Sequence, residues 1–256
     1  MRKFFLEEVP TNPESILKSL WELTIKEKFY SLYLTKLILP NKYHTEILSD
    51  HLIRAYCIAA KQYKDPLLSF AALTHDIGKV GTSQWCPIKK DYTFHKHEIH
   101  GSKLVHHWML HQNFTKEEAE RVRKVIKHHG FRFYPDSKES TILTWLVKLG
   151  RQGYHDVIRL SLIDRAANLA NEHKPLMTKE YLSLTRKIQS WIDSERILFP
   201  EQLVITGQEI RSSLVDKKLY QQLILDLVYT VSAKPEFNTK EYLRKQVSKY
   251  GVFKHN

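Results

Sequence analysis

A histidine and an aspartate stand side by side at the end of an apolar run, in Ala71-Ala72-Leu73-Thr74-His75-Asp76-Ile77-Gly78-Lys79. Adjacent residues on a helix do not share a face, so the pair is an unusual choice for packing in a core. Burying a carboxylate without a partner costs several kcal/mol, so the fold must bring neutralising groups to this point. The pair suits a metal ion reached from a helix end, where an imidazole nitrogen and a carboxylate oxygen both turn inward.

Apolar residues recur at intervals of three and four along most of the chain, which predicts an all-α fold. We expect helices near residues 14–38, 43–64, 66–76, 96–112, 116–129, 140–150, 155–173, 178–194, 215–232 and 238–249. Asp65-Pro66 is typical of a helix start, and Thr115-Lys-Glu-Glu118 is a capping box. Thr178 and Asn238 are further candidate caps. Residues 82–94 are expected to form an irregular loop, and no convincing strand pattern is found.

The composition is that of a soluble folded protein, with 42% hydrophobic and 27% charged residues. Two cysteines, Cys57 and Cys86, form no CxxC pair, which favours a reduced cytoplasmic setting. Glu7 and Glu8 end the first apolar run too early for a signal peptide. No stretch reaches the roughly 18 apolar residues of a membrane span, so no membrane association is expected.

A formal charge of +12 favours an anionic partner over the alternative, a surface that is basic without a specific purpose. Because the basic residues are spread along the chain, charge alone does not separate a nucleotide from a nucleic acid.

Further candidate metal ligands lie on both sides of the His75-Asp76 pair. His51 precedes it on a predicted helix face, where a hydrogen-bonded core histidine is the alternative. Asp164 lies within an apolar helix; a salt bridge to Arg165 is its alternative, although neighbours on a helix diverge. Eight of the 14 histidines fall between residues 95 and 129. Among these we predict His97 and His128 as ligands, keep His100 and His129 as substitutes, and expect His106, His107 and His111 to face solvent.

Imidazole and carboxylate ligands suit Mn, Co, Ni, Fe or Zn, and less strictly Mg. His51, His75, Asp76 and Asp164 would hold one divalent ion and leave positions open for water and phosphate. His97 and His128 would add a second ion, bridged by Asp76. Lys79 and Arg54 are predicted to meet the substrate phosphate, the alternative for such a lysine being plain solvation. The predicted catalytic residues are therefore Asp76 and Lys79.

The order H…HD…H…H…D resembles the HD superfamily of metal-dependent phosphohydrolases. The segments Phe70-Ala-Ala-Leu-Thr-His-Asp-Ile-Gly-Lys79, His97-Glu-Ile-His-Gly101 and Val125-Ile-Lys-His-His129 are similar to the HD domain of bacterial CCA-adding tRNA nucleotidyltransferases. The resemblance covers roughly residues 45–250 and includes Leu203–Ile210 and Leu223–Leu243 of the tail. It implies an HD-domain helical bundle with a smaller C-terminal helical extension. The implied division is an N-terminal helical segment (1–42), an HD phosphohydrolase domain (43–174) and a helical tail (175–256).

The chain departs from those enzymes in two places. No Gly-Ser pair is followed by an Asp-x-Asp, so the nucleotidyltransferase head is missing and the chain is not expected to add nucleotides. Asp216-Lys217-Lys218 stands where the family's tail usually has a Gly-Pro turn, which argues against simple inheritance of tRNA binding.

Three functions are compatible with these features. The first is a metal-dependent phosphohydrolase of nucleotide phosphomonoesters, a (deoxy)nucleoside 5′-monophosphatase. The second is a 2′,3′-cyclic phosphodiesterase or 2′-phosphatase on RNA or tRNA ends. The third is a non-catalytic, tRNA-binding partner of a separate nucleotidyltransferase, against which the full set of buried acids and histidines argues. Aromatic residues that would stack a base, with ordinary packing as their alternative, are Trp85, Tyr92, Phe94, Phe131, Phe133 and Tyr134.

Overall fold

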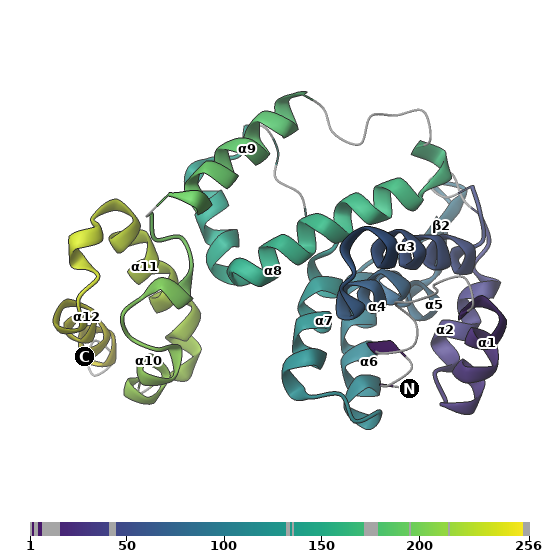
Figure 1. The fold of residues 1–256 in the computed structure, drawn as a ribbon, viewed down its shortest axis with the longest axis horizontal. Coiled ribbons are helices and arrows are strands. Elements are labelled where there is room, and N and C mark those ends of the chain that lie inside the picture. The colour runs from purple at the N-terminus through teal and green to yellow at the C-terminus, as the bar shows by residue number, and fades with distance from the viewer. Residues whose placement is uncertain are drawn as a thin grey trace. The chain divides into compact units, whose positions relative to one another are not determined.

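The computed structural model describes residues 2, 5–6, 16–40, 45–131, 134, 136–171, 179–194, 196–214 and 216–252. These residues form helices and one short two-stranded ribbon, which confirms the predicted all-α class (Figure 1). Contacts divide the chain into two compact units. Unit 1 comprises Met1–Phe131 and His155–Leu176, and unit 2 comprises Arg132–Tyr154 and Met177–Asn256. The predicted domain boundary at 174–178 falls outside the described residues, and the predicted three-part division stays a prediction.

Unit 1 holds the segments that carry the candidate ligands. Its helices are α1 (Ile16–Lys26), α2 (Tyr30–Leu34), α3 (Leu48–Tyr63), α4 (Pro66–Thr74), α5 (Lys79–Thr82), α6 (His97–His111), α7 (Lys116–His128) and the second part of α8 (Glu139–Ala167). The ribbon consists of β1 (Gln84–Cys86) and β2 (Asp91–Thr93), and short 3₁₀ turns lie at Thr35–Leu37 and Leu169–Asn171.

Helix α4 occupies the centre of unit 1. It packs against α3 on one side and α7 on another, and α6 packs against α7. Residues 68–74 of α4 are all buried, as expected of a helix that is apolar on every face. Its start follows the sequence prediction, because the Asp65 side chain accepts hydrogen bonds from the backbone N–H groups of Leu67 and Leu68. Because α4 is central and buried, the residues that follow its last turn lie in the interior of unit 1.

A buried ion-pair network ties α4, α7 and α8 together. The Arg121 guanidinium of α7 donates to both carboxylate oxygens of Asp156 on α8, at 2.8 and 3.0 Å, and also to the N-cap Asp65 of α4. Asp156 is fully buried. Burial by itself would lower the pKa of Arg121, but the hydrogen bonds to Asp156 and Asp65 raise that pKa above its usual value. Arg121 is therefore a structural residue and not part of a free basic surface.

Unit 2 has its own apolar core, formed mainly by α11 (Tyr220–Ala233) and residues packed on it. Its other helices are the first part of α8, α9 (Lys179–Asp193), α10 (Gly207–Ser213) and α12 (Lys240–Val252), with 3₁₀ turns at Pro200–Gln202, Lys217–Leu219 and Pro235–Phe237. In the described part of the chain, no helix has both the length and the hydropathy that a membrane crossing requires.

The local predictions are confirmed at several helix ends. Thr115 and Glu118 form the predicted capping box of α7. Helix α8 is interrupted at Gly150, whose φ of 70° is left-handed, so the two helices predicted around this point are separated by a glycine that can adopt this conformation.

Three local predictions were wrong or incomplete. Residues 84–86 and 91–93 form an antiparallel ribbon in which Trp85 pairs with Tyr92, whereas we expected an irregular loop. The cap of α12 is Thr239, whose Oγ1 accepts from the Tyr242 N–H, because Asn238 instead bonds Gln202 and Val204. Helix α10 was not predicted, since its seven residues are too few to show a clear period. The candidate cap Thr178 lies outside the described residues.

Candidate metal centre

Five helices bring the candidate ligands together in unit 1. His51 lies in the middle of α3, and His75 is the C-cap residue of α4 with Asp76 directly after it. His97 is the first residue of α6, His129 is the C-cap residue of α7, and Asp164 belongs to α8. Because α4 ends in the interior, residues 75 and 76 are both buried and no longer need to share a helix face.

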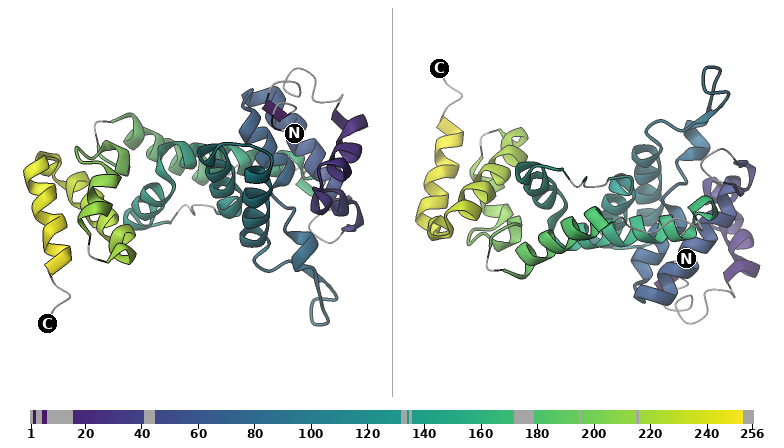
Figure 2. Two further views of the ribbon diagram at one scale, coloured as in Figure 1. Left: turned by 90° about the horizontal axis from the view of Figure 1, so that it is seen from below. Right: turned by 90° about the horizontal axis from the view of Figure 1, so that it is seen from above.

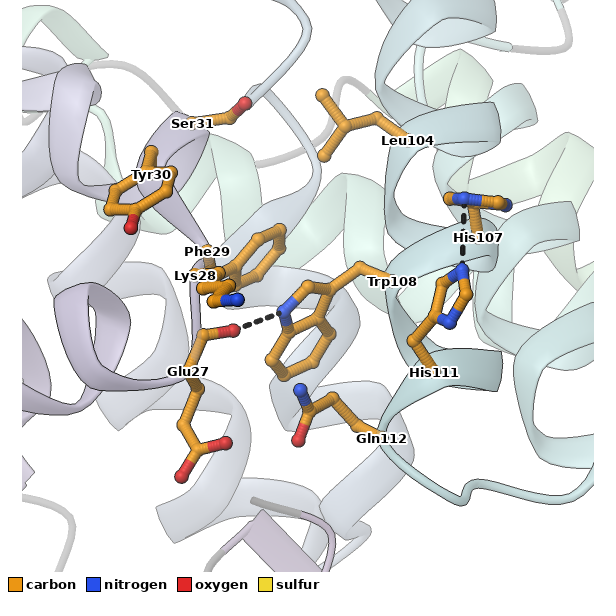
Figure 3. A pocket seen from close by; sticks show the side chains of 10 residues that line it. All are labelled: Glu27, Lys28, Phe29, Tyr30, Ser31, Leu104, His107, Trp108, His111 and Gln112. Atoms are coloured by element: carbon orange, nitrogen blue, oxygen red, sulfur yellow. Dashed lines mark hydrogen bonds between the residues drawn. The ribbon is translucent and has the colours of Figure 1, made fainter.

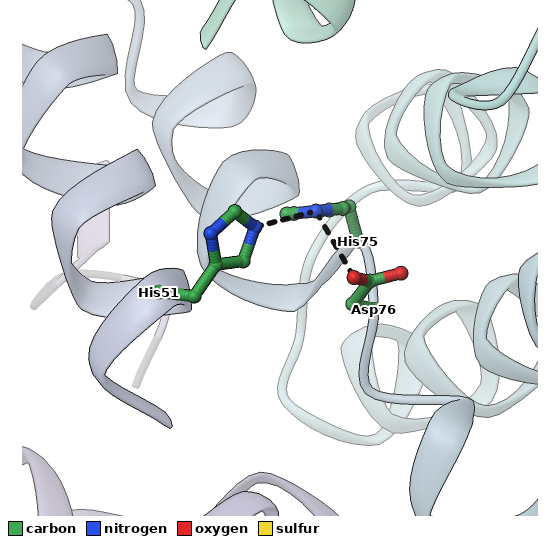
Figure 4. Close-up of side chains that lie close together, drawn as sticks. All are labelled: His51, His75 and Asp76. Atoms are coloured by element: carbon green, nitrogen blue, oxygen red, sulfur yellow. Dashed lines mark hydrogen bonds and ion pairs between the residues drawn. The ribbon is translucent and has the colours of Figure 1, made fainter. Parts of the chain in front are cut away.

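The first group surrounds His75. The Nε2 atoms of His51 and His75 lie 3.4 Å apart, and Asp164 Oδ1 is 3.1 Å from the former and 3.5 Å from the latter. Asp76 Oδ2 lies 3.6 Å from His75 Nε2. Figure 4 shows the imidazole of His51, projecting from α3, directed toward His75 and Asp76. Three helices thus contribute to one cluster of converging nitrogen and oxygen atoms.

The second group uses the other oxygen of the same carboxylate. Asp76 Oδ1 lies 3.0 Å from His97 Nε2 and 3.4 Å from His129 Nε2. The two imidazole nitrogens are 3.3 Å apart. Asp76 therefore faces one group with each oxygen, which is the placement of a carboxylate that bridges two ions.

The spacing of these atoms fits a shared metal ion. Ligand atoms about 2.1 Å from an ion lie about 3.0 Å apart at octahedral angles and about 3.4 Å apart at tetrahedral angles. The separations given above run from 3.0 to 3.6 Å, and the three ligand atoms of each set lie within 4.8 Å of one another. Both sets, His51-His75-Asp76 and Asp76-His97-His129, can each direct one atom toward a common point.

The hydrogen bonds of the histidine rings also favour a metal ion at this place. The Nδ1 atoms of His75, His97 and His129 lie 2.9, 2.8 and 2.7 Å from the carbonyl oxygens of residues 72, 94 and 126. A carbonyl oxygen only accepts, so each Nδ1 carries a proton, and an Nε2 without a proton would present its lone pair to the cluster. Lone pairs that face one another at 3.3 Å repel unless a cation or a proton lies between them. The donor set therefore fits a divalent ion.

The two acids carry negative charge under neutral conditions. Burial by itself would raise the pKa of Asp76, but Lys79 and the surrounding histidines hold that pKa well below its usual range. Burial acts in the same sense on Asp164, and contacts with His51 and His75 hold the pKa of Asp164 well below its usual range. For His97, the carboxylate of Asp76 outweighs burial and raises the pKa. Two carboxylates among imidazoles provide the anionic ligands that a divalent ion requires.

An outer layer of contacts holds His51. Glu46 Oε1 lies 3.9 Å from His51 Nδ1, and the same carboxylate accepts two hydrogen bonds from Arg54, at 2.5 and 2.6 Å. Arg54 also donates to the carbonyl oxygen of Ala167 at 2.7 Å, near the end of α8. At 3.9 Å the Glu46 carboxylate makes no hydrogen bond with His51 Nδ1, so its influence on the ring is electrostatic. Arg54 was predicted to meet phosphate, but these partners direct its guanidinium toward Glu46 and Ala167.

Lys79 lies where the sequence predicted a cation. Its Nζ is 2.5 Å from Asp76 Oδ2 and 5.6 Å from the centre of the Phe94 ring. Its side chain is buried, as expected for a charged group that is paired with a buried acid.

One predicted ligand is replaced by its neighbour. His128 is half-buried in the last turn of α7 and belongs to neither group, whereas His129 is buried and contacts Asp76 and His97. The helical periodicity of α7 distinguishes His129 from His128. Val122, Val125 and Ile126 are buried, and residue 129 lies seven, four and three positions after them, on the same face of α7.

The remaining histidines lie outside the two groups. His100 is exposed and its ring lies against Gly81. His107 and His111 are exposed, as predicted, and their Nε2 atoms lie 3.1 Å apart. They line a groove of about 480 Å³ between residues 27–31 and helix α6. Trp108 also lines this groove, and its indole N–H donates to the carbonyl oxygen of Glu27 (Figure 3). His106 is half-buried, with Glu120 at 4.0 Å.

Sequence comparison agrees with this geometry. Residues 48–169 match the family model of the HD domain. The match includes all six residues of the two groups.

Two curated relatives illustrate the similarity. The chain is 39% identical over 67 residues to the Multifunctional CCA protein of Legionella pneumophila strain Paris, and 37% identical over 67 residues to that of strain Lens. Each match covers 26% of this chain and 15% of the relative, so the chain spans only a small part of the length of these proteins. No solved structure matches the chain significantly.

Proposed function

We propose that this protein is a metal-dependent phosphohydrolase that hydrolyses nucleotide phosphomonoesters, with a (deoxy)nucleoside 5′-monophosphate as the first candidate substrate. The observation that carries the proposal is the pair of ligand groups joined by the two oxygens of Asp76. Members of the HD family are metal-dependent hydrolases, which fits the chemistry of this donor set.

A divalent ion held by these residues lowers the pKa of water toward about 7 and neutralises charge on phosphoryl oxygens. His51, His75 and Asp164 would hold one ion, His97 and His129 a second, and Asp76 would serve both. Mn, Co, Ni, Fe, Zn and Mg are the candidates for such a mixed set.

The exposure of the ligands indicates where substrate enters. The side chains of His51 and His75 are fully buried, whereas those of Asp164 and His97 are 21% and 22% exposed. Solvent therefore reaches the cluster on the side of Asp164 and His97. A phosphate that arrives there meets the ammonium of Lys79, which is held 2.5 Å from the bridging carboxylate. Lys79 would orient the phosphate and stabilise the negative charge that develops on it.

RNA ends are the second candidate substrate, processed by 2′,3′-cyclic phosphodiesterase or 2′-phosphatase chemistry. The printed name of the matched relatives, Multifunctional CCA protein, supports this candidate together with the resemblance to CCA-adding enzymes. The same ligands and the same lysine would act on either substrate, so the candidates differ in what is bound beyond the phosphate.

The deciding experiment measures phosphate release from 5′-, 3′- and 2′-monophosphates and 2′,3′-cyclic nucleotides, in ribo and deoxy forms. Metal-stripped protein is supplied with Mg, Mn, Co or Ni. We expect metal-dependent turnover that Asp76→Asn reduces at least about 100-fold, because several kcal/mol of charge stabilisation are lost. Asp193→Asn, an exposed aspartate of α9, is the matched control. Near-normal turnover of Asp76→Asn would refute the metal assignment.

A further inference from the structure

The β1–β2 ribbon and its turn, residues 84–93, stand out from the body of unit 1 in both views of Figure 2. The segment exposes three large apolar side chains, with Trp85 56%, Ile88 95% and Tyr92 52% exposed. Trp85 and Tyr92 are cross-strand partners, so they lie on one face of the ribbon, with ring centres 5.4 Å apart. Folding alone does not account for aromatic residues placed on a protruding ribbon, where they bury little surface.

The ribbon begins and ends at the metal centre. Helix α5, which carries Lys79, leads into β1, and β2 leads through Phe94 to His97. The carbonyl of Phe94 accepts from His97 Nδ1 at 2.8 Å, and Lys79 lies over the Phe94 ring. Tyr92 is two residues before Phe94, about 7 Å along an extended strand. The aromatic pair is therefore joined through Phe94 to the groups that would bind phosphate.

The turn of the ribbon adds positive charge farther out. Residues 84–96 contain three lysines (Lys89, Lys90 and Lys96) and a single acid, Asp91. The three lysines are exposed and form no ion pair with any described residue. Lys90 has a left-handed φ of 48°, a conformation that glycine adopts at no cost and other residues adopt at about 1–3 kcal/mol. Glycine therefore fits the backbone of this turn, so the side chain of Lys90 can be removed without strain.

We propose that this ribbon binds single-stranded nucleic acid and leads its terminal phosphate to the metal centre. Trp85 and Tyr92 stack bases, and Lys89 and Lys90 contact phosphates beyond the terminal one. Stacking faces alternating with basic side chains are how proteins bind single strands without sequence preference. A free mononucleotide carries a single phosphate and leaves none for the lysines of the turn to contact, so this surface favours a strand end, the second candidate substrate, over a nucleoside 5′-monophosphate. The inference rests on the proposed phosphohydrolase function and selects the strand-end substrate.

The net charge favours a nucleic-acid strand over a second copy of this chain as the partner of the ribbon. Each copy carries a formal charge of +12, so two ribbons brought together would repel one another, whereas a polyanion is attracted.

Binding is tested with a fluorescein-labelled oligouridylate of about 12 nucleotides. Anisotropy is recorded with the full chain in metal-free buffer, so that no turnover is needed. Trp85→Ala/Tyr92→Ala should weaken binding at least about 30-fold, because two stacking interactions of at least about 1 kcal/mol each are lost. Lys89→Ala/Lys90→Gly should reduce the slope of log K against log salt by about 1.4, the value for two lost phosphate contacts. Because glycine suits the turn, loss of binding in this variant does not reflect unfolding, which a thermal melt verifies.

The matched controls lie in unit 2. Lys217→Ala/Lys218→Ala removes another exposed lysine pair, and Tyr229→Ala removes another exposed aromatic residue, 48% exposed on α11. Both should bind like the wild type. The proposal is overturned if the wild type does not bind, if the ribbon variants bind normally, or if sedimentation shows that they disrupt a dimer. Binding without any phosphate release would refute the hydrolase function alone. Hydrolysis of mononucleotides without strand binding would refute the ribbon surface alone.

Discussion

Gly78→Ala should displace His97 in the second ligand group and leave the first ligand group in place. A Cβ on residue 78 would lie 2.0 Å from the carbonyl oxygen of His97 and 2.6 Å from the backbone nitrogen of Gly101. Real contacts stay above 3.0 Å, so the backbone at His97 must retreat by at least 3.0 − 2.0 = 1.0 Å. That displacement separates His97 Nε2 from Asp76 Oδ1, which now lie 3.0 Å apart.

The effect should be confined to the second group, because the ligands of the first group do not depend on the start of α6. The remaining ligands of the first group come from α3, α4 and α8, whereas Gly78 lies against the start of α6. We expect bound metal to fall from two ions to one. Activity should fall about 100-fold, the usual consequence of a 1 Å misplacement at a reacting centre. The overpacked contact should cost about 1–3 kcal/mol of stability.

A graded series of alanine substitutions provides the controls. Gly101→Ala places its Cβ 3.0 Å from the Gly78 nitrogen, so a smaller effect is expected. Gly130→Ala, directly after His129, meets nothing within 4 Å and should leave metal content unchanged. Metal content is measured by elemental analysis after dialysis, activity by phosphate release, and stability by circular dichroism. If Gly78→Ala keeps two ions and near-normal activity, the close approach of Gly78 to α6 does not position His97.

Two further substitutions test contacts around the centre. Glu46→Gln removes the negative charge 3.9 Å from His51 Nδ1 and should weaken metal affinity about 10-fold by calorimetry, the lower end of the effect of carboxylates behind a ligating histidine; unchanged affinity would show that Glu46 does not support the histidine. Arg121→Met leaves the buried carboxylate of Asp156 without its guanidinium partner and should cost about 3–5 kcal/mol in urea unfolding. A cost below about 1 kcal/mol would mean that water or another group compensates for the lost pair.

Much of the fold follows from local signals in the sequence. Asp65-Pro66 and the capping box at Thr115 define helix starts by hydrogen bonds that involve only neighbouring residues, so they are readable without the tertiary structure. The ribbon at 84–93 was missed because three-residue strands show too short an alternation to be recognised. Its pairing of Trp85 with Tyr92 depends on a turn that brings the strands together.

The sequence by itself determined the all-α class and the match to the HD-domain family, and it predicted five of the six residues that the structure brings together in the two groups. It could do so because tandem His75-Asp76 and an isolated Asp164 in apolar helices demand neutralising partners wherever they are buried. Only the tertiary structure decided between His128 and His129, and only it assigned Arg54 to Glu46 and Arg121 to Asp156. Those choices depend on how α3, α7 and α8 meet across α4. Such contacts join residues far apart in the chain, and no local spacing encodes them.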